Sequence, residues 1–262
     1  MSLSISSINY CPVKSVSFQS INECEIKKNI GIVGDRIFAF AKNLDLEAVK
    51  LFEKNPKDRK GKWNKILTLK NTPVLNKYNF LFNENKLTLI FKDKEILNID
   101  VNNFKERQLL SKKIIELESF IKEPIMLMKN EEYPFFDTTI SNKVDFINSV
   151  SLINIQSIND FQKKIGIKIE IPRFRGNIYI DGIKPWIERE WIGKTIKINN
   201  ISFKVEKNIP RCVAINLRPN TNDDSLNLLS LLKKTYNHFD MGIYLTALND
   251  GKIKIGNNIL IQ

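Results

Sequence analysis

The chain has 262 residues, 42% hydrophobic and 27% charged, which is the composition of a soluble globular protein with one large or two small domains. Its formal net charge is +12, but Lys residues are scattered among Glu and Asp and no arginine-rich tract occurs, which argues against nucleic-acid binding. Three cysteines exclude a disulfide framework, and neither a signal peptide nor a membrane-spanning apolar run is present. We therefore expect a cytoplasmic protein.

The first hundred residues are predicted to form mainly strands, because short alternating or apolar runs are separated by turn residues. These strands are expected at residues 5–10, 21–27, 37–40, 66–69, 80–82 and 87–91, the last two joined as a hairpin by the turn at 83–86. Leu110, Ile114, Leu117 and Ile121 recur at helical spacing and predict a helix over 104–122 that ends before Pro124. The loop at 133–137 is the predicted boundary between two halves.

The second half is predicted to alternate strands with short helices. Strands are expected at 150–153, 177–180, 195–198 and 201–206, and a short helix at 226–233. A further helix is predicted to begin with Ser157 as its N-cap and to stop at Gly166. The end of the chain predicts a hairpin of 242–248 with 252–261 around a type I′ turn at 249–251. Many short strands with few helices indicate a mainly β fold with β-barrel architecture.

The strongest chemical signal is Arg211-Cys212, which follows an alternating, strand-like run at 201–205. A neighbouring guanidinium favours the thiolate, which is both a nucleophile and a soft metal ligand. The alternative is a small buried hydrophobic residue, the commonest role of a single Cys. The only histidine, His238, has no feature that places it beside a nucleophile, so a hydrolytic triad is not favoured.

Other cofactor signatures are absent from the sequence. It has no paired Cys and His for zinc, no clustered Cys for an iron–sulfur centre, and no glycine-rich nucleotide motif. Arginine is scarce beside lysine, so each arginine is a candidate for gripping phosphate or carboxylate. With Lys14, Ser15, Arg36 and the Arg173–Arg175 pair, these residue types suit an anionic cofactor that carries a phosphate and a soft metal.

The motifs resemble those of MOSC-domain proteins. Cys11-Pro12-Val13-Lys14-Ser15 and Gly31-Ile32-Val33-Gly34-Asp35-Arg36 look like the N-terminal β-barrel half of this family. Arg173-Phe174-Arg175-Gly176-Asn177, Asp181-Gly182, Pro185-Trp186, Arg211-Cys212 and Gly242-Ile243-Tyr244 look like the MOSC domain itself. The resemblance implies a β-barrel-like domain at 1–125 followed by a MOSC β-barrel domain at 126–262. One departure is Gly176, which stands where the family usually has Pro.

The resemblance also implies a cofactor and its ligands. The family binds the molybdenum cofactor, a molybdopterin, so Cys212 is expected to be the catalytic residue and the protein ligand of the metal. The implied cofactor-binding residues are Lys14, Ser15, Arg36, Asn154, Arg175, Asn177, Arg211 and Tyr244.

Two-domain members of this family include the mitochondrial amidoxime-reducing component and its bacterial relatives. The resemblance therefore implies a molybdenum-dependent reductase of small N-hydroxylated compounds: amidoximes, hydroxylamines or N-hydroxylated bases. We expect a monomer without nucleic-acid or membrane partners, supplied with electrons by a separate flavin, haem or iron–sulfur protein. The alternative is a cofactor carrier or sulfur-transfer protein without reductase activity, because MOSC domains also occur in cofactor sulfurases. An RNA-binding barrel is disfavoured, since no stripe of aromatics and Lys is present.

Overall fold

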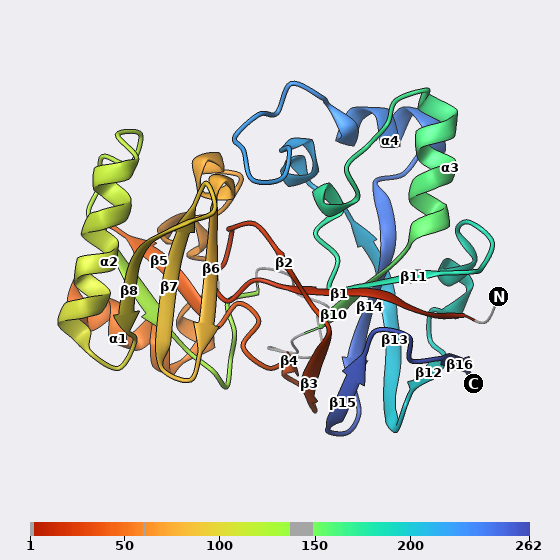
Figure 1. Ribbon diagram of the computed structural model, residues 1–262, viewed down its shortest axis with the longest axis horizontal. Helices are drawn as coiled ribbons and strands as arrows, with labels where there is room; N and C mark the ends of the chain where they lie inside the picture. Colours follow the sequence, from red (N-terminus) through yellow and green to blue (C-terminus); the bar gives the residue numbers. More distant parts are fainter. Residues whose placement is uncertain (1–2, 60, 137–148) are drawn as a thin grey trace.

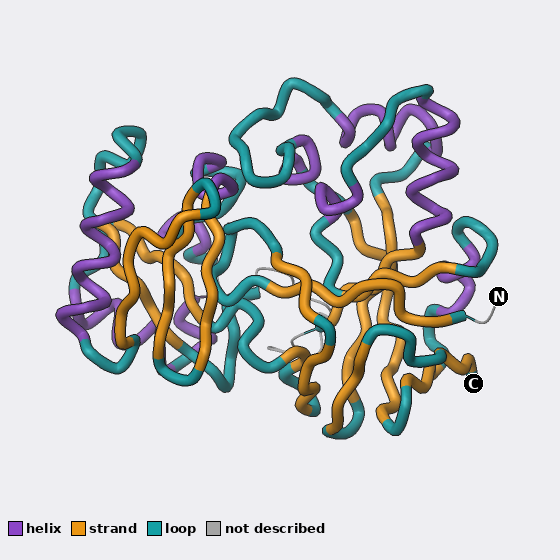
Figure 2. The backbone as a smooth tube through the Cα atoms, in the orientation of Figure 1, coloured by secondary structure: helices purple, strands orange, loops and turns teal. Residues whose placement is uncertain are grey.

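The computed structural model describes residues 3–59, 61–136 and 149–262. The described chain is mainly β with a few helices, which confirms the predicted fold class. Figure 1 shows two parts side by side, a smaller one with α1 and α2 on one flank and a larger one with α3 and α4 above a sheet. Figure 2 shows that strands form the middle of both parts and that helices cover them.

The smaller part is built from two small sheets. β5 pairs with β9, and β6, β7 and β8 form an antiparallel meander whose β6–β7 hairpin was predicted. Its elements are β5 (Phe38–Lys42), α1 (Leu46–Lys54), β6 (Tyr78–Asn83), β7 (Lys86–Phe91), β8 (Lys94–Asp100), α2 (Phe104–Leu117) and β9 (Ile125–Lys129), with 3-10 turns η1 (Pro56–Arg59), η2 (Trp63–Lys65) and η3 (Pro73–Lys77).

The larger part centres on an eight-stranded sheet in the order β16-β12-β13-β14-β10-β11-β1-β2. Its elements are β1 (Ser4–Tyr10), β2 (Gln19–Ile21), β10 (Val150–Asn154), β11 (Ile178–Asp181), β12 (Thr195–Ile198), β13 (Ile201–Pro210), β14 (Asp240–Ala247) and β16 (Ile259–Ile261). A second sheet joins β15 (Gly251–Lys254), β3 (Glu23–Lys27) and β4 (Gly31–Ile32). The covering segments are α3 (Ile155–Ile165), α4 (Leu228–Tyr236), η4 (Ile171–Phe174), η5 (Ile187–Trp191) and η6 (Val213–Asn216).

The N-terminal strands belong to the larger part. β1 pairs antiparallel with β11, and β3 pairs with β15, so both ends of the chain build the same sheets. In Figure 1, β1 runs from the N-terminus through the large sheet toward the smaller part. Strands from before residue 125 pair with strands that lie at or after it, and the division of the chain there stays a prediction. The segment after β1 therefore lies between the two parts.

Each part has its own apolar core. The smaller part packs Phe38, Phe40, Phe80, Leu89 and Ile114 together. One cluster of the larger part fills the space under the sheet, and another joins the sheet to α3 and α4. Leu217, which follows η6 in the larger part, is buried in the core of the smaller one and ties the parts together. Among the described residues, no helix combines the length and apolarity needed to cross a bilayer.

The start of α3 corrects one prediction. Its N-cap is Asn154, whose side chain accepts a hydrogen bond from the backbone N–H of Gln156, and not Ser157, which lies in the first turn. Asn and Ser are comparable caps, so the sequence could not choose between two candidates three residues apart. The helix does stop at Gly166, whose φ of 68° is the left-handed conformation that glycine adopts readily.

The predicted C-terminal hairpin is wrong. β14 pairs with β13 and β10, whereas β15 pairs with β3 and β16 pairs with β12. A type I′ turn needs positive φ at both central residues, and neither Asn249 nor Asp250 has it. Their side chains instead accept hydrogen bonds from the backbone N–H groups of Ser202 and Lys28. Long-range bonds therefore outweigh the local turn signal.

Other corrections lie in the smaller part. Residues 66–69 form no strand, only an isolated bridge from Ile66 to Ala41. α1, β8 and β9 were not predicted; Lys and Glu interrupt the apolar pattern of α1 and β8, and β9 is a short apolar run beside Pro124. The predicted boundary loop at 133–137 is described only to Phe136, so Asp137 lies outside the described residues.

Candidate functional site

Cys212 lies where β13 ends and η6 begins. Its side chain is exposed, and its carbonyl accepts a hydrogen bond from the backbone N–H of Ile215 at 3.1 Å. η6 then carries the chain to Leu217, buried in the other core. The thiol thus stands at the junction of the two parts on a short, anchored turn. Cys11 and Cys24 are buried, and burial raises their pKa values to about 11 and about 12. Among the three cysteines, only Cys212 is open to a ligand.

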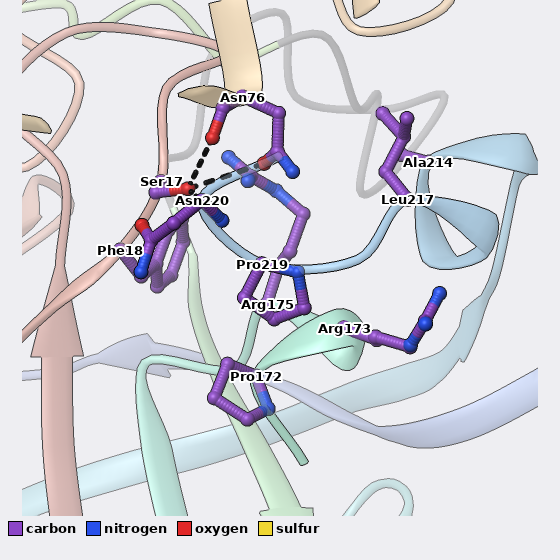
Figure 3. Close-up of a pocket in the computed structure, with 10 residues that line it drawn as sticks. All are labelled: Ser17, Phe18, Asn76, Pro172, Arg173, Arg175, Ala214, Leu217, Pro219 and Asn220. Carbon is purple, nitrogen blue, oxygen red and sulfur yellow. Dashed lines mark hydrogen bonds between the residues drawn. The ribbon is translucent and has the colours of Figure 1, made fainter. Parts of the chain in front are cut away.

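A cleft opens beside this junction (Figure 3). It is a small cleft, with a cavity volume of about 80 Å³, and it is continuous with solvent. Both parts contribute to its walls: Ser17, Phe18, Asn76, Pro172, Arg173, Arg175, Ala214, Leu217, Pro219 and Asn220. Figure 3 shows the Arg175 side chain extending toward Ser17 and Phe18, while Arg173 points away. The cleft therefore has walls of mixed polar and apolar character and one inward guanidinium.

Arg175 is the notable cation of this cleft. It is half-buried, and its guanidinium makes no hydrogen bond or ion pair with any residue that the structure describes. Its Cζ lies 4.7 Å from the ring centroid of Phe18. Burial lowers the pKa of Arg175, the nearby Cys11 and Cys212 raise it, and the charge of Arg36 lowers it. An unmatched, partly desolvated guanidinium favours an anionic ligand.

Arg173, in contrast, forms hydrogen bonds with other residues of the protein. Its Nε donates to Glu170 at 2.7 Å, and its Nη1 donates to the carbonyl of Asn216. It is buried, so this guanidinium is satisfied within the protein. The two arginines that the sequence suggested as a pair on one face are therefore not equivalent, and Arg175 alone faces the cleft without an acceptor from the described residues.

Arg36 lies against Phe18, which is one of the residues that line the cleft. It pairs with the carboxylate of Asp35, and its Cζ lies 4.8 Å from the ring of Phe18 and 4.6 Å from that of Phe136. Because Phe18 contacts both Arg36 and Arg175, the structure brings these two predicted anion-binding residues to one ring. Ser15, Arg36 and Arg175 have φ of 69°, 55° and 50°, a conformation that non-glycine residues adopt mainly where surrounding contacts impose it.

Asp35 anchors the turn that carries Arg36. It is 2% exposed, and it accepts hydrogen bonds from the backbone N–H of Cys11 at 2.9 Å and from Nδ2 of Asn177 at 3.1 Å. It therefore connects β1, the turn before β5 and the start of β11. The sequence motif contains Asp35, but only the fold reveals this role.

Asn177 is buried within that network. Its Oδ1 accepts from the backbone N–H and hydroxyl of Ser151, and its Nδ2 donates to Asp35 and to the carbonyl of Asn9. Each polar atom of the amide thus has protein partners, so Asn177 holds strands together beside the site. A direct contact between Asn177 and a cofactor stays a prediction.

Lys14 and Ser15 are buried in the segment between β1 and β2, 5% and 8% exposed. The backbone N–H of Lys14 donates to the carbonyl of Phe38 at 2.8 Å, which attaches the segment after β1 to β5. Tyr244 is half-buried on β14, opposite Ser151 of β10 and Lys207 of β13 in the strand register. The cofactor contacts predicted for these three residues remain untested.

Arg211 uses its guanidinium on backbone carbonyls. Its Nε donates to Met241 at 2.8 Å, its Nη1 donates to Phe174 at 2.7 Å, and its Nη2 also donates to Met241. Burial lowers its pKa, while Tyr244, Tyr179 and Cys212 raise it. Arg211 therefore fastens the residue before Cys212 to the residue before Arg175.

Asn154 belongs to a separate buried network. Besides capping α3, its Nδ2 donates to the carbonyl of Lys184 at 2.8 Å and to Glu188 at 3.0 Å. Ser157 donates to Glu188 at 2.7 Å and accepts from the backbone N–H of Trp186. Burial raises the pKa of Glu188. The described contacts of Asn154 are thus structural, and its predicted cofactor role has no support from them.

Two residues of the site were not predicted from the sequence. Phe18 lies outside the quoted motifs, and Asn76 comes from a 3-10 turn that no pattern predicts. Asn76 donates to the carbonyls of Arg218 and Thr221 at 2.8 and 2.9 Å, and so joins the two parts across the cleft. The contact spans more than 140 positions, so no local signal could have found it. Among the described residues, no group of three or more His, Cys, Asp and Glu could hold a metal.

Comparison with known proteins gives matches over the second half. Residues 137–260 match the family model of the MOSC domain. A molybdenum cofactor sulfurase of Caenorhabditis elegans is 32% identical over 114 residues, which is 41% of this chain and 16% of that protein. One of Drosophila willistoni is 30% identical over 115 residues, covering 42% and 14%. The match thus spans about a sixth of these relatives' length.

Solved structures resemble the chain more distantly. The YuaD protein of Bacillus subtilis covers 100% of this chain and 96% of its own at 10% identity and a TM-score of 0.44. YiiM of Geobacillus stearothermophilus covers 43% of this chain and 53% of its own at 13% identity and a TM-score of 0.34.

Proposed function

We propose that the cleft between the two parts binds the molybdenum cofactor and that Cys212 is the protein ligand of the metal, since residues 137–260 match the family model of the MOSC domain and the motifs of the chain resemble that family. The observation that carries this proposal is the combination of an exposed thiol with the unmatched guanidinium of Arg175. A single thiolate suffices here, because the organic part of the cofactor holds the metal as well.

The residues present fit such a group. A phosphorylated pterin needs cations for its phosphate, and Arg36 and Arg175 lie against one ring at the cleft. Thiolate is a ligand that soft metals prefer, and Cys212 is exposed. The apolar walls near Pro172 and Leu217 would exclude water from a planar ligand.

The proposed activity is reduction of small N-hydroxylated compounds. When bound, the molybdenum centre supplies two-electron chemistry at an N–O bond, and the protein supplies binding, orientation and electrostatics. Cys212 would hold the metal at the junction, and Arg36 and Arg175 would neutralise the phosphate. A separate electron-transfer protein, carrying a flavin, haem or iron–sulfur group, would deliver the electrons. The motif resemblance to the amidoxime-reducing family supports this proposal.

The second candidate is cofactor carriage or sulfur transfer. It is supported by the matched relatives, which are molybdenum cofactor sulfurases. Because the match spans only 14–16% of those proteins, their whole activity does not follow for this chain. Both candidates use the same cleft and Cys212, and they differ in whether an external electron donor is needed.

The first experiment tests the shared part of both candidates. The protein is produced in a host that makes the molybdenum cofactor, and molybdenum and pterin are measured in the wild type, in Cys212→Ala and in the control Cys11→Ala. We expect near-stoichiometric molybdenum in the wild type, loss of the metal in Cys212→Ala, and retention in Cys11→Ala. Equal metal content in the wild type and Cys212→Ala would remove Cys212 from the ligand role.

The second experiment separates the candidates. Loaded protein is mixed with benzamidoxime and the artificial donor reduced methyl viologen, and formation of benzamidine is followed. Turnover that depends on both donor and Cys212 supports the reductase. Loaded protein that gives no benzamidine, yet passes its cofactor or sulfur to an acceptor apo-enzyme, would favour the carrier or sulfur-transfer role.

A further inference from the structure

The sequence around Phe18 does not predict where this residue lies in the fold. It lies between Ser15 and β2, is half-buried, and packs at the edge of the smaller part's core. Its ring centroid is 4.8 Å from Cζ of Arg36 and 4.7 Å from Cζ of Arg175. One aromatic ring therefore contacts two guanidinium groups, one from the turn before β5 and one from the turn before β11. Figure 3 shows Phe18 and Arg175 on the cleft wall.

Two guanidinium groups against one half-buried ring repel each other. Burial lowers the pKa of Arg175, and the charge of Arg36 lowers it further. Arg36 has Asp35 as a partner, whereas the Arg175 guanidinium has no carboxylate or carbonyl among the described residues. An aromatic face carries negative charge density and attracts a nearby cation. The ring of Phe18 thus offsets part of this repulsion for both arginines.

We propose that Phe18 is a positioning residue: it holds the guanidinium groups of Arg36 and Arg175 together so that both reach one phosphorylated ligand. The proposal rests on the proposed function only in identifying that ligand as the cofactor. The pairing of the two arginines through one ring is a property of the empty protein.

Phe136 provides a matched contrast. Its ring lies 4.6 Å from Cζ of Arg36, and no contact joins it to Arg175. Loss of Phe136 should therefore loosen one arginine, and loss of Phe18 should loosen both. Phe82 is a second control, since it is half-buried against the same core as Phe18 and packs edge-on against Phe38, at 5.1 Å between ring centroids, instead of against a guanidinium.

The first readout is spectroscopic and needs no cofactor. Side-chain Nε–H resonances of Arg36 and Arg175 are recorded by ¹⁵N NMR in the cofactor-free wild type and in Phe18→Leu, Phe18→Tyr, Phe136→Leu and Phe82→Leu. We expect slow guanidinium motion for both arginines in the wild type and Phe18→Tyr. Phe18→Leu should broaden or average both signals, Phe136→Leu only that of Arg36, and Phe82→Leu neither.

The second readout is anion affinity, with inorganic phosphate as the probe in a calorimetric titration. Loss of a ring shared by two cations should weaken binding about tenfold in Phe18→Leu and about threefold in Phe136→Leu. Phe18→Tyr should restore the affinity, because it keeps the ring. A purely structural role predicts instead that Phe82→Leu weakens binding as much as Phe18→Leu.

Two outcomes would overturn the proposal. One is unchanged Arg36 and Arg175 signals in Phe18→Leu, and the other is equal phosphate affinity in Phe18→Leu and the wild type. Failure of the proposed function is a different result: the arginine signals and phosphate affinity would behave as expected, while the wild type produced in a cofactor-making host contains no molybdenum.

Discussion

Arg211 donates hydrogen bonds from both Nε and Nη2 to the carbonyl oxygen of Met241. Its remaining terminal nitrogen, Nη1, donates to the carbonyl of Phe174 at 2.7 Å. These bonds join the end of β13, the start of β14 and the 3-10 turn that precedes Arg175. Arg211 and Arg175 are both half-buried arginines near Cys212, yet one is fully committed to the backbone and the other faces the cleft.

Replacing Arg211 with Ala should therefore destabilise the fold. Three charge-assisted hydrogen bonds are lost and two carbonyls lose a donor, so we expect a decrease of about 2–4 kcal/mol in the free energy of unfolding. Urea denaturation followed by circular dichroism measures the change. A decrease below about 0.5 kcal/mol would mean that the hydrogen bonds of Arg211 to the Met241 and Phe174 carbonyls do not stabilise the fold.

Arg175→Ala should leave the stability of the fold nearly unchanged and weaken the binding of anions. Its guanidinium makes no hydrogen bond within the described residues, so the free energy of unfolding should change by less than about 1 kcal/mol. Affinity for inorganic phosphate should fall at least tenfold, on the order expected for a charged partner. Calorimetric titration at fixed ionic strength measures this, and an unchanged affinity would show that the anion site lies elsewhere.

The cysteines give a chemical test of the site. Cys212 is exposed, whereas Cys11 and Cys24 are buried and have raised pKa values of about 11 and about 12. Reactivity needs both access and thiolate, so iodoacetamide should modify the native protein once, at Cys212. Peptide mass spectrometry identifies the position, and the unfolded protein should be modified at all three. Equal labelling of Cys11 in the native state would contradict its burial.

Residues close in sequence were the predictable part of this site. Arg211 and Cys212 follow an alternating run that forms β13, and Asp35 and Arg36 occupy a turn before β5, as the local pattern indicates. The regular strands and the mainly β class follow from the same period-two signal. The local pattern does not indicate which strands pair with one another.

The C-terminal hairpin illustrates that limit. Asn249 and Asp250 are typical of a hairpin turn. β15 nevertheless pairs along its whole length with β3 from the other end of the chain, and the predicted local hairpin does not form. In the same way, Phe18 meets Arg175 across more than 150 positions. Motif reasoning named the arginine because its chemistry is specific, and it missed the phenylalanine because an apolar residue near a strand predicts only core.

The surroundings of Gly176 account for a glycine at this position, where the family usually has Pro. Its backbone N–H donates to the hydroxyl of Tyr179 at 3.0 Å, and a Cβ added here would lie 2.7 Å from Cδ1 of Ile153. Gly176→Ala should cost about 1–2 kcal/mol in unfolding free energy through overpacking. Gly176→Pro should cost about 1–3 kcal/mol more, because it also removes the donor to a buried hydroxyl.

Urea denaturation of both variants measures these costs. The double variant Gly176→Pro with Tyr179→Phe is the control, because it lacks the hydroxyl that would otherwise lose its hydrogen bond from residue 176. Its additional loss relative to Tyr179→Phe alone should be smaller than the loss from Gly176→Pro in the wild type. Equal losses in the two backgrounds would mean that the Tyr179 hydrogen bond contributes nothing.

The single histidine predicts how stability depends on pH. Burial lowers the pKa of His238 below its ordinary 6.5, the neighbouring charge of Arg189 lowers it further, and Asp240 opposes them. Because the folded state binds the proton more weakly than the unfolded chain, folding gains from this group when the imidazole is neutral. That contribution is present above pH 6.5 and is lost as the pH falls through the lower, folded value. The free energy of unfolding should therefore decrease between about pH 8 and about pH 5.

The control is His238→Asn, which removes the titrating group. Unfolding is measured by urea at a series of pH values, and the difference in stability between the two proteins is plotted against pH. His238→Asn should lose less stability on acidification than the wild type, because carboxylates elsewhere titrate alike in both. A wild type that becomes more stable relative to His238→Asn as the pH falls would mean that the folded protein binds the proton more tightly, and that Asp240 outweighs burial and Arg189.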